Sequence, residues 1–282
     1  MTSLSTRAWP GRVALWTYRH VRRTGLLSIP PVRRAYELAY SRYKRHIEDP
    51  FYNLTRVHPE LFRGGHVIDA GANIGYTAGV FAAAVDPGYR VWAFEPSSEN
   101  FELLRRSIAD RRAHGVIIAR RAGVGDRVGT MDLILNPGHP GDHHVAPLED
   151  RAGTSESHGG IERVPVTTID EEVRAHAIAP VAFIKIDVQG YELHVCRGMS
   201  GTLDMNRRAA VVLEYAPDTM PQYGVGPEEL SQFFAQRGYS GYRVTQRGGL
   251  EALNVLELPR DLPPPGYINV LFTRAARDPG PS

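Results

Sequence analysis

The chain has 282 residues, of which 42% are hydrophobic and 23% are charged, values that are ordinary for a globular protein. Its single cysteine, Cys196, excludes an internal disulfide framework and a cysteine-only metal site, and favours a reducing, cytoplasmic location. No apolar run reaches the roughly 18 residues that span a bilayer. The first residues do not match a secretory signal, because they lack a sustained apolar core followed by a small-residue cleavage site.

The formal net charge of +2 hides an uneven distribution along the chain. Residues 1–50 hold ten Arg and Lys residues against three acidic residues, and the rest of the chain is net acidic. We expect residues 1–60 to form a basic helical extension whose arginines lie on a solvated helix face. The alternatives are contacts with nucleic acid, anionic lipid or an acidic face of a second subunit. No nucleic-acid partner is expected, and homo-oligomerisation through the extension is left open.

From residue 64 onward, short apolar runs alternate with segments of helical periodicity. Strands are expected within residues 66–75, 89–96, 115–124, 129–136, 162–169, 181–188, 209–216, 239–245 and 267–274. Helices are expected within residues 76–85, 97–110 and 226–238, and from about residue 192. Strands that alternate with helices in this way indicate βαβ units and a mostly parallel sheet.

Four of the predicted strands end on a carboxylate, at Asp69, Glu95, Asp187 and Glu214. The carboxyl ends of parallel strands lie at one edge of the sheet, which is where ligands bind in open α/β folds. Since an unpaired carboxylate inside the sheet would cost several kcal/mol, we expect these four groups at the rim of a binding site.

The stretch DAGANIG predicts a ligand-binding turn after the first strand. Gly71 and Gly75 let the backbone approach a ligand closely, and the next helix offers free N–H groups. The pattern departs from G-x-G-x-x-G, and Asp69 puts a negative charge where a pyrophosphate would sit. Glu95 is placed to accept hydrogen bonds from both hydroxyls of a ribose. A ligand with a ribose and a cationic amino-acid end is S-adenosylmethionine.

Four stretches resemble, in order, the landmarks of the FkbM family of S-adenosylmethionine-dependent methyltransferases. They are VIDAGANIGYTAGVFA, VWAFEPSSENFELL, VTTIDEEV and FIKIDVQGYELHVCRGM. The resemblance implies a Rossmann-like class I methyltransferase fold over residues 61–275, with seven mostly parallel strands and an antiparallel last strand. It also implies O-methylation of a hydroxyl on a small metabolite, such as a natural product or a sugar. Residues 276–282 are expected to form a disordered tail.

The resemblance also implies roles for single residues. Asp69, Gly71 and Asn73 would line the methionine part of the cofactor, with Gly75 in the same loop; Glu95 would hold the ribose, Asp126 would lie near the adenine, and Asp187 would face the methyl group and substrate. One position departs from the family, which commonly has Asp-Val-Glu-Gly where this chain has Gln189. If that glutamate is catalytic in relatives, its role is vacant here, whereas Gln189 can replace it if it only caps the next helix.

Methyl transfer requires an aligned acceptor oxygen and a base that takes its proton. The candidate bases are Asp187, His143, His144 and Glu214. Both histidines lie in the Gly-, His- and Pro-rich stretch 137–160, which we expect to form a lid over the substrate. The alternative is an ordinary polar surface loop.

Asp187 and Glu214 also resemble the acidic pair by which some sugar and catechol O-methyltransferases hold Mg²⁺. We favour a metal-free site, because such sites generally add a third oxygen ligand. Lys185, two residues before Asp187 on the same strand face, is expected to point away from the site and to pair with a neighbouring acid. Two rival functions stay open: a nucleotide-dependent oxidoreductase on a similar sheet, and a catalytically silent cofactor-binding scaffold, which the departure at Gln189 suggests.

Overall fold

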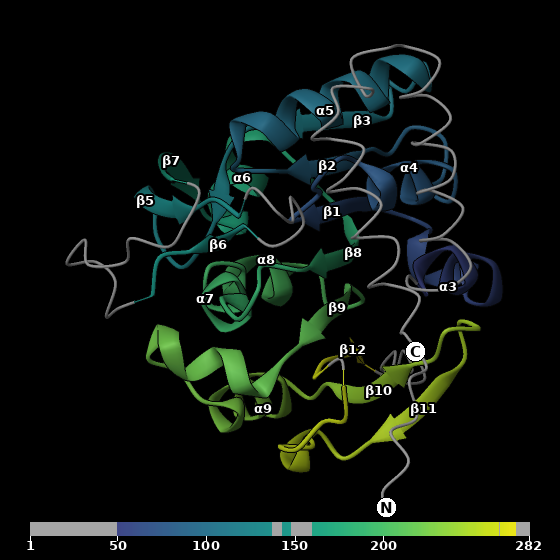
Figure 1. The fold of residues 1–282 in the computed structure, drawn as a ribbon. Coiled ribbons are helices and arrows are strands. Elements are labelled where there is room, and N and C mark those ends of the chain that lie inside the picture. The colour runs from purple at the N-terminus through teal and green to yellow at the C-terminus, as the bar shows by residue number, and fades with distance from the viewer. Residues whose placement is uncertain (1–49, 137–142, 148–159, 265, 275–282) are drawn as a thin grey trace, which may run out of the picture.

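The structure is a computed structural model that describes residues 50–136, 143–147, 160–264 and 266–274. The predicted basic extension up to residue 49, most of the predicted lid and the predicted tail lie outside these ranges. The described residues form three layers, with helices on both faces of a large sheet (Figure 1). No helix in the described part of the chain is long and apolar enough to cross a bilayer.

The large sheet has eight strands in the order β11-β10-β12-β9-β8-β1-β2-β3. The strands are β1 (His66–Ala70), β2 (Val91–Phe94), β3 (Ile117–Arg120), β8 (Val181–Ile186), β9 (Ala210–Tyr215), β10 (Ser240–Val244), β11 (Leu250–Leu253) and β12 (Ile268–Thr273). Strands β3, β2, β1, β8 and β9 pair in parallel, whereas β12 runs antiparallel to both of its neighbours. The predicted mostly parallel sheet with an antiparallel last strand is therefore confirmed.

The predicted count of seven strands is wrong by one. The additional strand, β11, forms an antiparallel pair with β10 at the outer edge of the sheet. Its sequence, LEAL, has two exposed residues in the middle and no long apolar run. A short edge strand of this kind buries too little to leave a clear pattern in the sequence.

Alternate side chains of each central strand enter two different cores. Val67, Phe183 and Val212 face α3 (Phe51–Val57), α4 (Tyr76–Ala82) and α5 (Ser98–Asp110). On the opposite face, Ile68, Ile184 and their neighbours contact α6 (Ile169–His176), α7 (Glu192–Arg197), α8 (Ser200–Met205) and α9 (Pro227–Ala235). Figure 1 shows the two helix layers on either side of the sheet. Because both faces are covered, the strands are apolar throughout rather than alternating.

The first described residues belong to the packed body of the domain. Phe51 of α3 lies 5.8 Å from the ring of Phe81 in α4. Phe62, in the short helix η3 (Pro59–Phe62), lies 4.4 Å from Phe183 and 5.5 Å from Phe81, measured between ring centroids. The packed domain therefore includes residues 51–62, and most of these precede the predicted start at residue 61.

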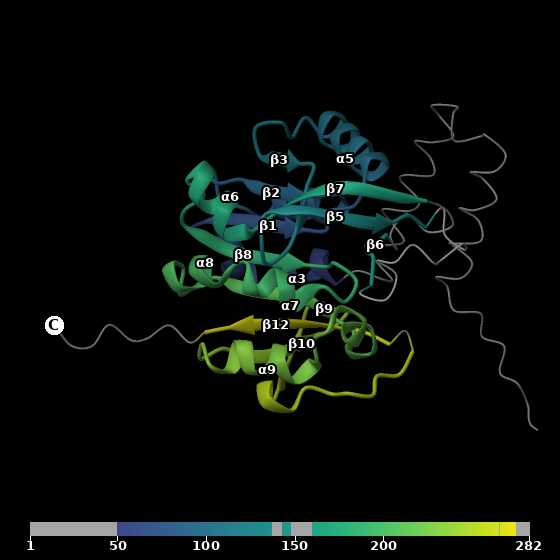
Figure 2. The same cartoon turned by 90° about the vertical axis from the view of Figure 1, so that its left-hand side faces the viewer.

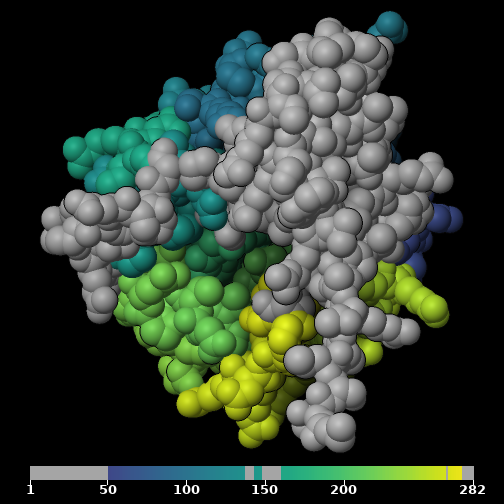
Figure 3. Space-filling model, in the orientation of Figure 1, coloured from purple at the N-terminus to yellow at the C-terminus, as the bar shows by residue number. Residues whose placement is uncertain are grey.

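A smaller sheet follows β3 in the chain. It consists of β4 (Gly123–Val124), β7 (Ile161–Thr167), β5 (Gly129–Ile134) and β6 (His144–Val145), in that spatial order. In Figure 1, β5 and β7 lie to the left of β1 and β2, on the side of α6. Figure 2 shows β5 and β7 as neighbouring strands. In the space-filling view, teal residues of this region lie above the green residues of the α7–α9 region (Figure 3).

Two details of this smaller sheet differ from the sequence prediction. Residues 115–124 form two strands rather than one, because the chain leaves the large sheet after Arg120 and pairs with β7 from Gly123. Within the predicted lid, His144 and Val145 form an edge strand that pairs with β5. The other short helices are η5 (Pro217–Tyr223) and η6 (Val255–Glu257).

Candidate active site

The glycine loop after β1 lies directly against the end of β8. Gly71 has a φ of +85°, and a Cβ atom at this position would lie 1.9 Å from the carbonyl oxygen of Asp187. The Asp187 amide in turn donates a hydrogen bond of 3.0 Å to the carbonyl of Ala70. Only glycine fits this contact. It brings the two sequence motifs, DAGANIG and IDVQG, together at the carboxyl edge of the sheet.

A buried lysine holds the base of this junction. The ammonium group of Lys185 lies 3.2 Å from Asp69 Oδ1 and 3.3 Å from Asp187 Oδ2, and it donates a 3.0 Å hydrogen bond to the Gly71 carbonyl. The expectation that Lys185 pairs with a neighbouring acid is confirmed, whereas the expectation that it points away from the site is wrong. Side chains two positions apart on a strand share a face, so Lys185 lies on the same side as Asp187, where two carboxylates offset the cost of burying its charge.

Asp69 is placed below the loop rather than at its surface. Its side chain is fully buried, and its second oxygen accepts a 2.7 Å hydrogen bond from the Thr77 hydroxyl. This position differs from the expected contact with the methionine part of a cofactor. With Lys185 on one oxygen and Thr77 on the other, Asp69 connects β8, the loop and α4.

Glu95, directly after β2, binds the other side of the same loop by hydrogen bonds. Its two oxygens accept hydrogen bonds from the backbone amides of Asn73, at 2.9 Å, and Ser97, at 3.0 Å. Asn73 has a φ of +49°, which turns its amide toward the carboxylate. Burial raises the pKa of Glu95 to about 7, although these hydrogen bonds lower it. Glu95 thus fixes the loop relative to the start of α5.

A cavity opens where these elements meet the smaller sheet. The predicted site residues that line it are Gly71, Asn73, Glu95, His143, His144 and Asp187. Asp69, Gly75, Asp126 and Glu214 do not line it. The sequence prediction missed Asn100 in α5, Met131 and Leu133 in β5, and Tyr191 before α7. Of these four residues, only Tyr191 lies directly next to a motif that the sequence analysis identified, the DVQG turn.

Gln189 links the two acids at the ends of β8 and β9. Its side-chain nitrogen lies 3.3 Å from Asp187 Oδ1 and 3.3 Å from Glu214 Oε1. Ionised carboxylates only accept hydrogen bonds, so the nitrogen of the amide faces both of them. Glu214, outside the cavity lining, is therefore joined to the site through Gln189.

Glu192, rather than Gln189, caps the turn that leads into α7. Its Oε1 accepts hydrogen bonds from the amides of Gly190, at 3.0 Å, and Val188, at 3.3 Å. The side chain is buried, and desolvation raises the pKa of Glu192 to about 7. Gln189 itself contacts the carboxylates of Asp187 and Glu214 rather than the amides of this turn.

Asp126 contacts a histidine instead of the cavity. Its Oδ2 lies 3.1 Å from Nδ1 of His194 in α7, whose Nε2 lies 3.2 Å from the carbonyl oxygen of Tyr223. The His194 ring stacks on Tyr191 with 4.2 Å between centroids. Since Tyr191 lines the cavity, Asp126 reaches the site through this stack.

His143 precedes β6, and its Nδ1 already accepts a hydrogen bond. The backbone amide of Asn136 donates a 3.0 Å hydrogen bond to Nδ1 of His143. A neutral His143 then carries its proton on Nε2, so neither nitrogen is open to a second proton while this bond lasts. His144 also lines the cavity.

The acid pair does not suit a divalent cation. Within the described residues, no group of three or more His, Cys, Asp or Glu side chains could hold a metal ion. An N–H donor group, from Gln189, lies against both Asp187 and Glu214. A magnesium site requires several oxygen ligands around the ion, and here the Gln189 amide turns its N–H₂ group, not its oxygen, toward both acids.

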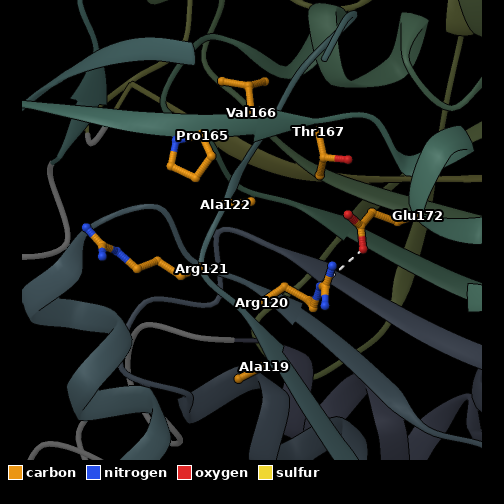
Figure 4. Close-up of a pocket in the computed structure, with 8 residues that line it drawn as sticks. All are labelled: Ala119, Arg120, Arg121, Ala122, Pro165, Val166, Thr167 and Glu172. Carbon is orange, nitrogen blue, oxygen red and sulfur yellow. Dashed lines mark ion pairs between the residues drawn. The ribbon is translucent and has the colours of Figure 1, made fainter. Parts of the chain in front are cut away.

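A larger cavity, of about 360 Å³, lies outside this site (Figure 4). It is bordered by the end of β3, by β7 and by α6. Arg120 at its edge forms a 3.2 Å ion pair with Glu172, and Arg121 forms a 2.7 Å ion pair with Glu162. Both cations are thus already compensated, and none of the predicted site residues borders this cavity.

The strand order β3-β2-β1-β8-β9-β12-β10, with β12 antiparallel, defines a Rossmann-like class I methyltransferase fold. Residues 69–240 match the methyltransferase FkbM domain, and the chain belongs to this family. The predicted family and fold are thereby confirmed.

Two named proteins are similar to this chain, at 25% and 28% identity. The chain is 25% identical over 179 residues to methyltransferase sdnD of Sordaria araneosa, a match that covers 56% of this chain and 67% of that one. It is 28% identical over 168 residues to hexuronic acid methyltransferase AglP of Haloferax volcanii, covering 60% of each. A solved methyltransferase FkbM from Methylobacillus flagellatus KT shares 18% identity with a TM-score of 0.48, over 83% of this chain and half of that one.

Proposed function

We propose that the chain is an S-adenosylmethionine-dependent O-methyltransferase that acts on a hydroxyl group of a small metabolite. The observation that carries this proposal is the meeting of the glycine loop, Glu95 and Asp187 around one cavity at the carboxyl edge of the sheet. This edge is where open α/β folds bind their ligands.

The lining of the cavity suits S-adenosylmethionine. Glu95 would accept hydrogen bonds from the ribose hydroxyls, and the backbone at Gly71 and Asn73 would hold the methionine part. The carboxylates of Glu95 and Asp187 face the cavity without a Lys or Arg among the described lining residues, which favours a cationic ligand over a pyrophosphate. When bound, the cofactor supplies a methyl group activated by a positively charged sulfur.

Asp187 is suited to orient the acceptor. One of its oxygens accepts a hydrogen bond from Gln189, and the other forms an ion pair with Lys185. Each oxygen keeps a lone pair, so the carboxylate can accept a hydrogen bond from the acceptor hydroxyl and hold it in line with the methyl group. The departing proton then passes to Asp187 itself or to His144, which borders the same cavity.

A carboxylate acceptor is the second candidate, because the Haloferax volcanii relative is named as a hexuronic acid methyltransferase. Such an acceptor would bring a second anion next to Asp187. The nearest cation, Lys185, is already shared between Asp69 and Asp187. The two carboxylates would repel each other, so the arrangement favours a hydroxyl acceptor over a carboxylate acceptor.

The proposal is tested in two stages. S-adenosylhomocysteine should raise the unfolding temperature of the full chain, whereas NAD should leave it unchanged; the opposite result would support a nucleotide-dependent oxidoreductase. Incubation with isotope-labelled S-adenosylmethionine and metabolite extracts should then yield a labelled product. Mild alkali hydrolyses a methyl ester but not a methyl ether, so alkali-stable label excludes a carboxylate acceptor and is the result expected for a hydroxyl acceptor. Ligand binding with no transfer to any extract would support the silent scaffold.

A further inference from the structure

Residue 189 occupies a constrained position in the turn after β8. Gln189 has a φ of +56°, a left-handed conformation that is uncommon for a residue with a side chain. Gly190 follows with a φ of +97°, and a Cβ atom there would lie 2.7 Å from the Thr219 hydroxyl. Glu192 ties the turn together by accepting from the amides of Val188 and Gly190. The backbone therefore directs the Gln189 side chain toward the strand ends.

The side chain contacts two acids that come from different strands. Asp187 follows β8, and Glu214 lies in β9, which pairs in parallel with β8. Both contacts use the same amide nitrogen, at 3.3 Å each. A primary amide carries two N–H donors, and here one is available for each carboxylate. The pair of acids is thus joined by a neutral group with a fixed geometry.

This bridge has the position that a cation would take between two carboxylates. An ion would have to displace the amide to reach both acids, and the remaining side chains in the described part of the chain do not complete a ligand set. A glutamate at residue 189 would change the chemistry. It would put a third carboxylate beside Asp187 and Glu214, and such a cluster is stabilised either by a shared proton or by a bound cation.

We propose that the Gln189 amide cross-links Asp187 and Glu214 in place of a divalent cation, and that it thereby makes the acceptor side of this site independent of metal. The role in catalysis rests on the proposed methyltransferase function, whereas the bridge itself does not. Gln189 acts as a positioning residue, because it holds the carboxylate of Asp187 at the cavity.

The test is a calorimetric titration of the full chain with Mn²⁺, at a pH where carboxylates are ionised. The wild type should show no stoichiometric binding. Gln189→Glu should gain one site, with an affinity at least about tenfold above that of the wild type, because the number of charged oxygen ligands rises. The matched control is Gln222→Glu, which adds the same charge at an exposed position in η5 and should gain no site. Adding Glu214→Gln to the Gln189→Glu variant should abolish the new site.

Two results would overturn the proposal. One is stoichiometric Mn²⁺ binding by the wild type that Asp187→Asn or Glu214→Gln removes. The other is a Gln189→Glu variant that binds Mn²⁺ no better than the Gln222→Glu control. Stabilisation by S-adenosylhomocysteine, measured on each variant, shows that the fold and cofactor site remain. Loss of the proposed function would appear as absent ligand stabilisation in the wild type, and is thus separable from the metal result.

Discussion

The ammonium group of Lys185 lies 3.2 Å from the carboxylate of Asp69, and their side chains are 3% and 0% exposed. Neither charge has bulk water to solvate it, so each depends on the other. The pair joins β8 to the end of β1, directly beneath the loop that borders the cavity. The stability of the loop is therefore coupled to an ion pair that does not line the cavity.

Lys185→Met should lower the free energy of unfolding by about 3–5 kcal/mol, because it leaves a buried carboxylate without its cation. Urea denaturation of the purified variant measures this loss. The double variant Lys185→Met/Asp69→Asn should recover a large part of it, since the uncompensated charge is then gone. If the free energy of unfolding of Lys185→Met stays within about 1 kcal/mol of the wild-type value, the pair contributes little to stability.

Glu95→Ala should weaken the binding of S-adenosylhomocysteine by about 1–3 kcal/mol, the range for lost hydrogen bonds to a charged group. Isothermal titration calorimetry measures the change. Glu102→Ala is the control, because Glu102 is an exposed residue of α5 that pairs with Arg105. Equal affinities for the Glu95 variant and the wild type, with both folded, would remove Glu95 from the ligand site.

Glu192 should make the stability of the protein depend on pH. Burial raises the pKa of Glu192 from 4.5 to about 7, so the folded state keeps a proton that the unfolded state releases in this window. The contribution to stability therefore falls as the pH rises from 4.5 to about 7, by up to about 3 kcal/mol, and is constant above it. Glu192→Gln, which cannot titrate, should lose less stability across this range. Urea midpoints measured at several pH values compare the two proteins, and parallel curves would contradict the assignment.

Asp126→Ala should lower the free energy of unfolding by about 1–2 kcal/mol, because His194 loses a hydrogen-bond partner. Its affinity for S-adenosylhomocysteine should stay within about threefold of the wild type, less than 1 kcal/mol. Asp110→Ala, at the exposed last residue of α5, is the control. A loss of affinity of more than about tenfold in a folded Asp126 variant would instead support the adenine contact that the family resemblance implies.

The sequence was sufficient for the fold because its signals were local. Each central strand is an apolar run with a polar or glycine-rich end, and both Gly71 and Glu95 are placed by the strand that precedes them. The elements that it did not reveal depend on contacts distant in sequence. The edge strand β11 is defined by its pairing with β10, and the change of sheet after Arg120 depends on pairing with β7.

The same limit applies to the site. The sequence identifies Lys185, Gln189 and Asp126 as candidates for polar contacts. It does not show their partners, which lie on other strands or helices. Sequence spacing could not show that Lys185 lies between two acids or that Gln189 joins them. Nor could it show that Asp69 is buried against Lys185, because a carboxylate at a strand end has the same sequence pattern whether it faces a cavity or a buried lysine.

Once an acceptor is known, the pH dependence of turnover shows whether Asp187 or His144 is the general base. If Asp187 holds and deprotonates the acceptor, Asp187→Asn should lower kcat by at least about 100-fold, while S-adenosylhomocysteine still binds. His144→Gln should then change kcat by less than about threefold and leave the acidic limb of the kcat profile in place. If His144 is the base, its variant should lose that limb together with about 100-fold in kcat. Asp187→Asn would then mainly raise KM, because the carboxylate would only orient the hydroxyl. We expect the first pattern, since the Asp187 carboxylate is held at the cavity by both Lys185 and Gln189.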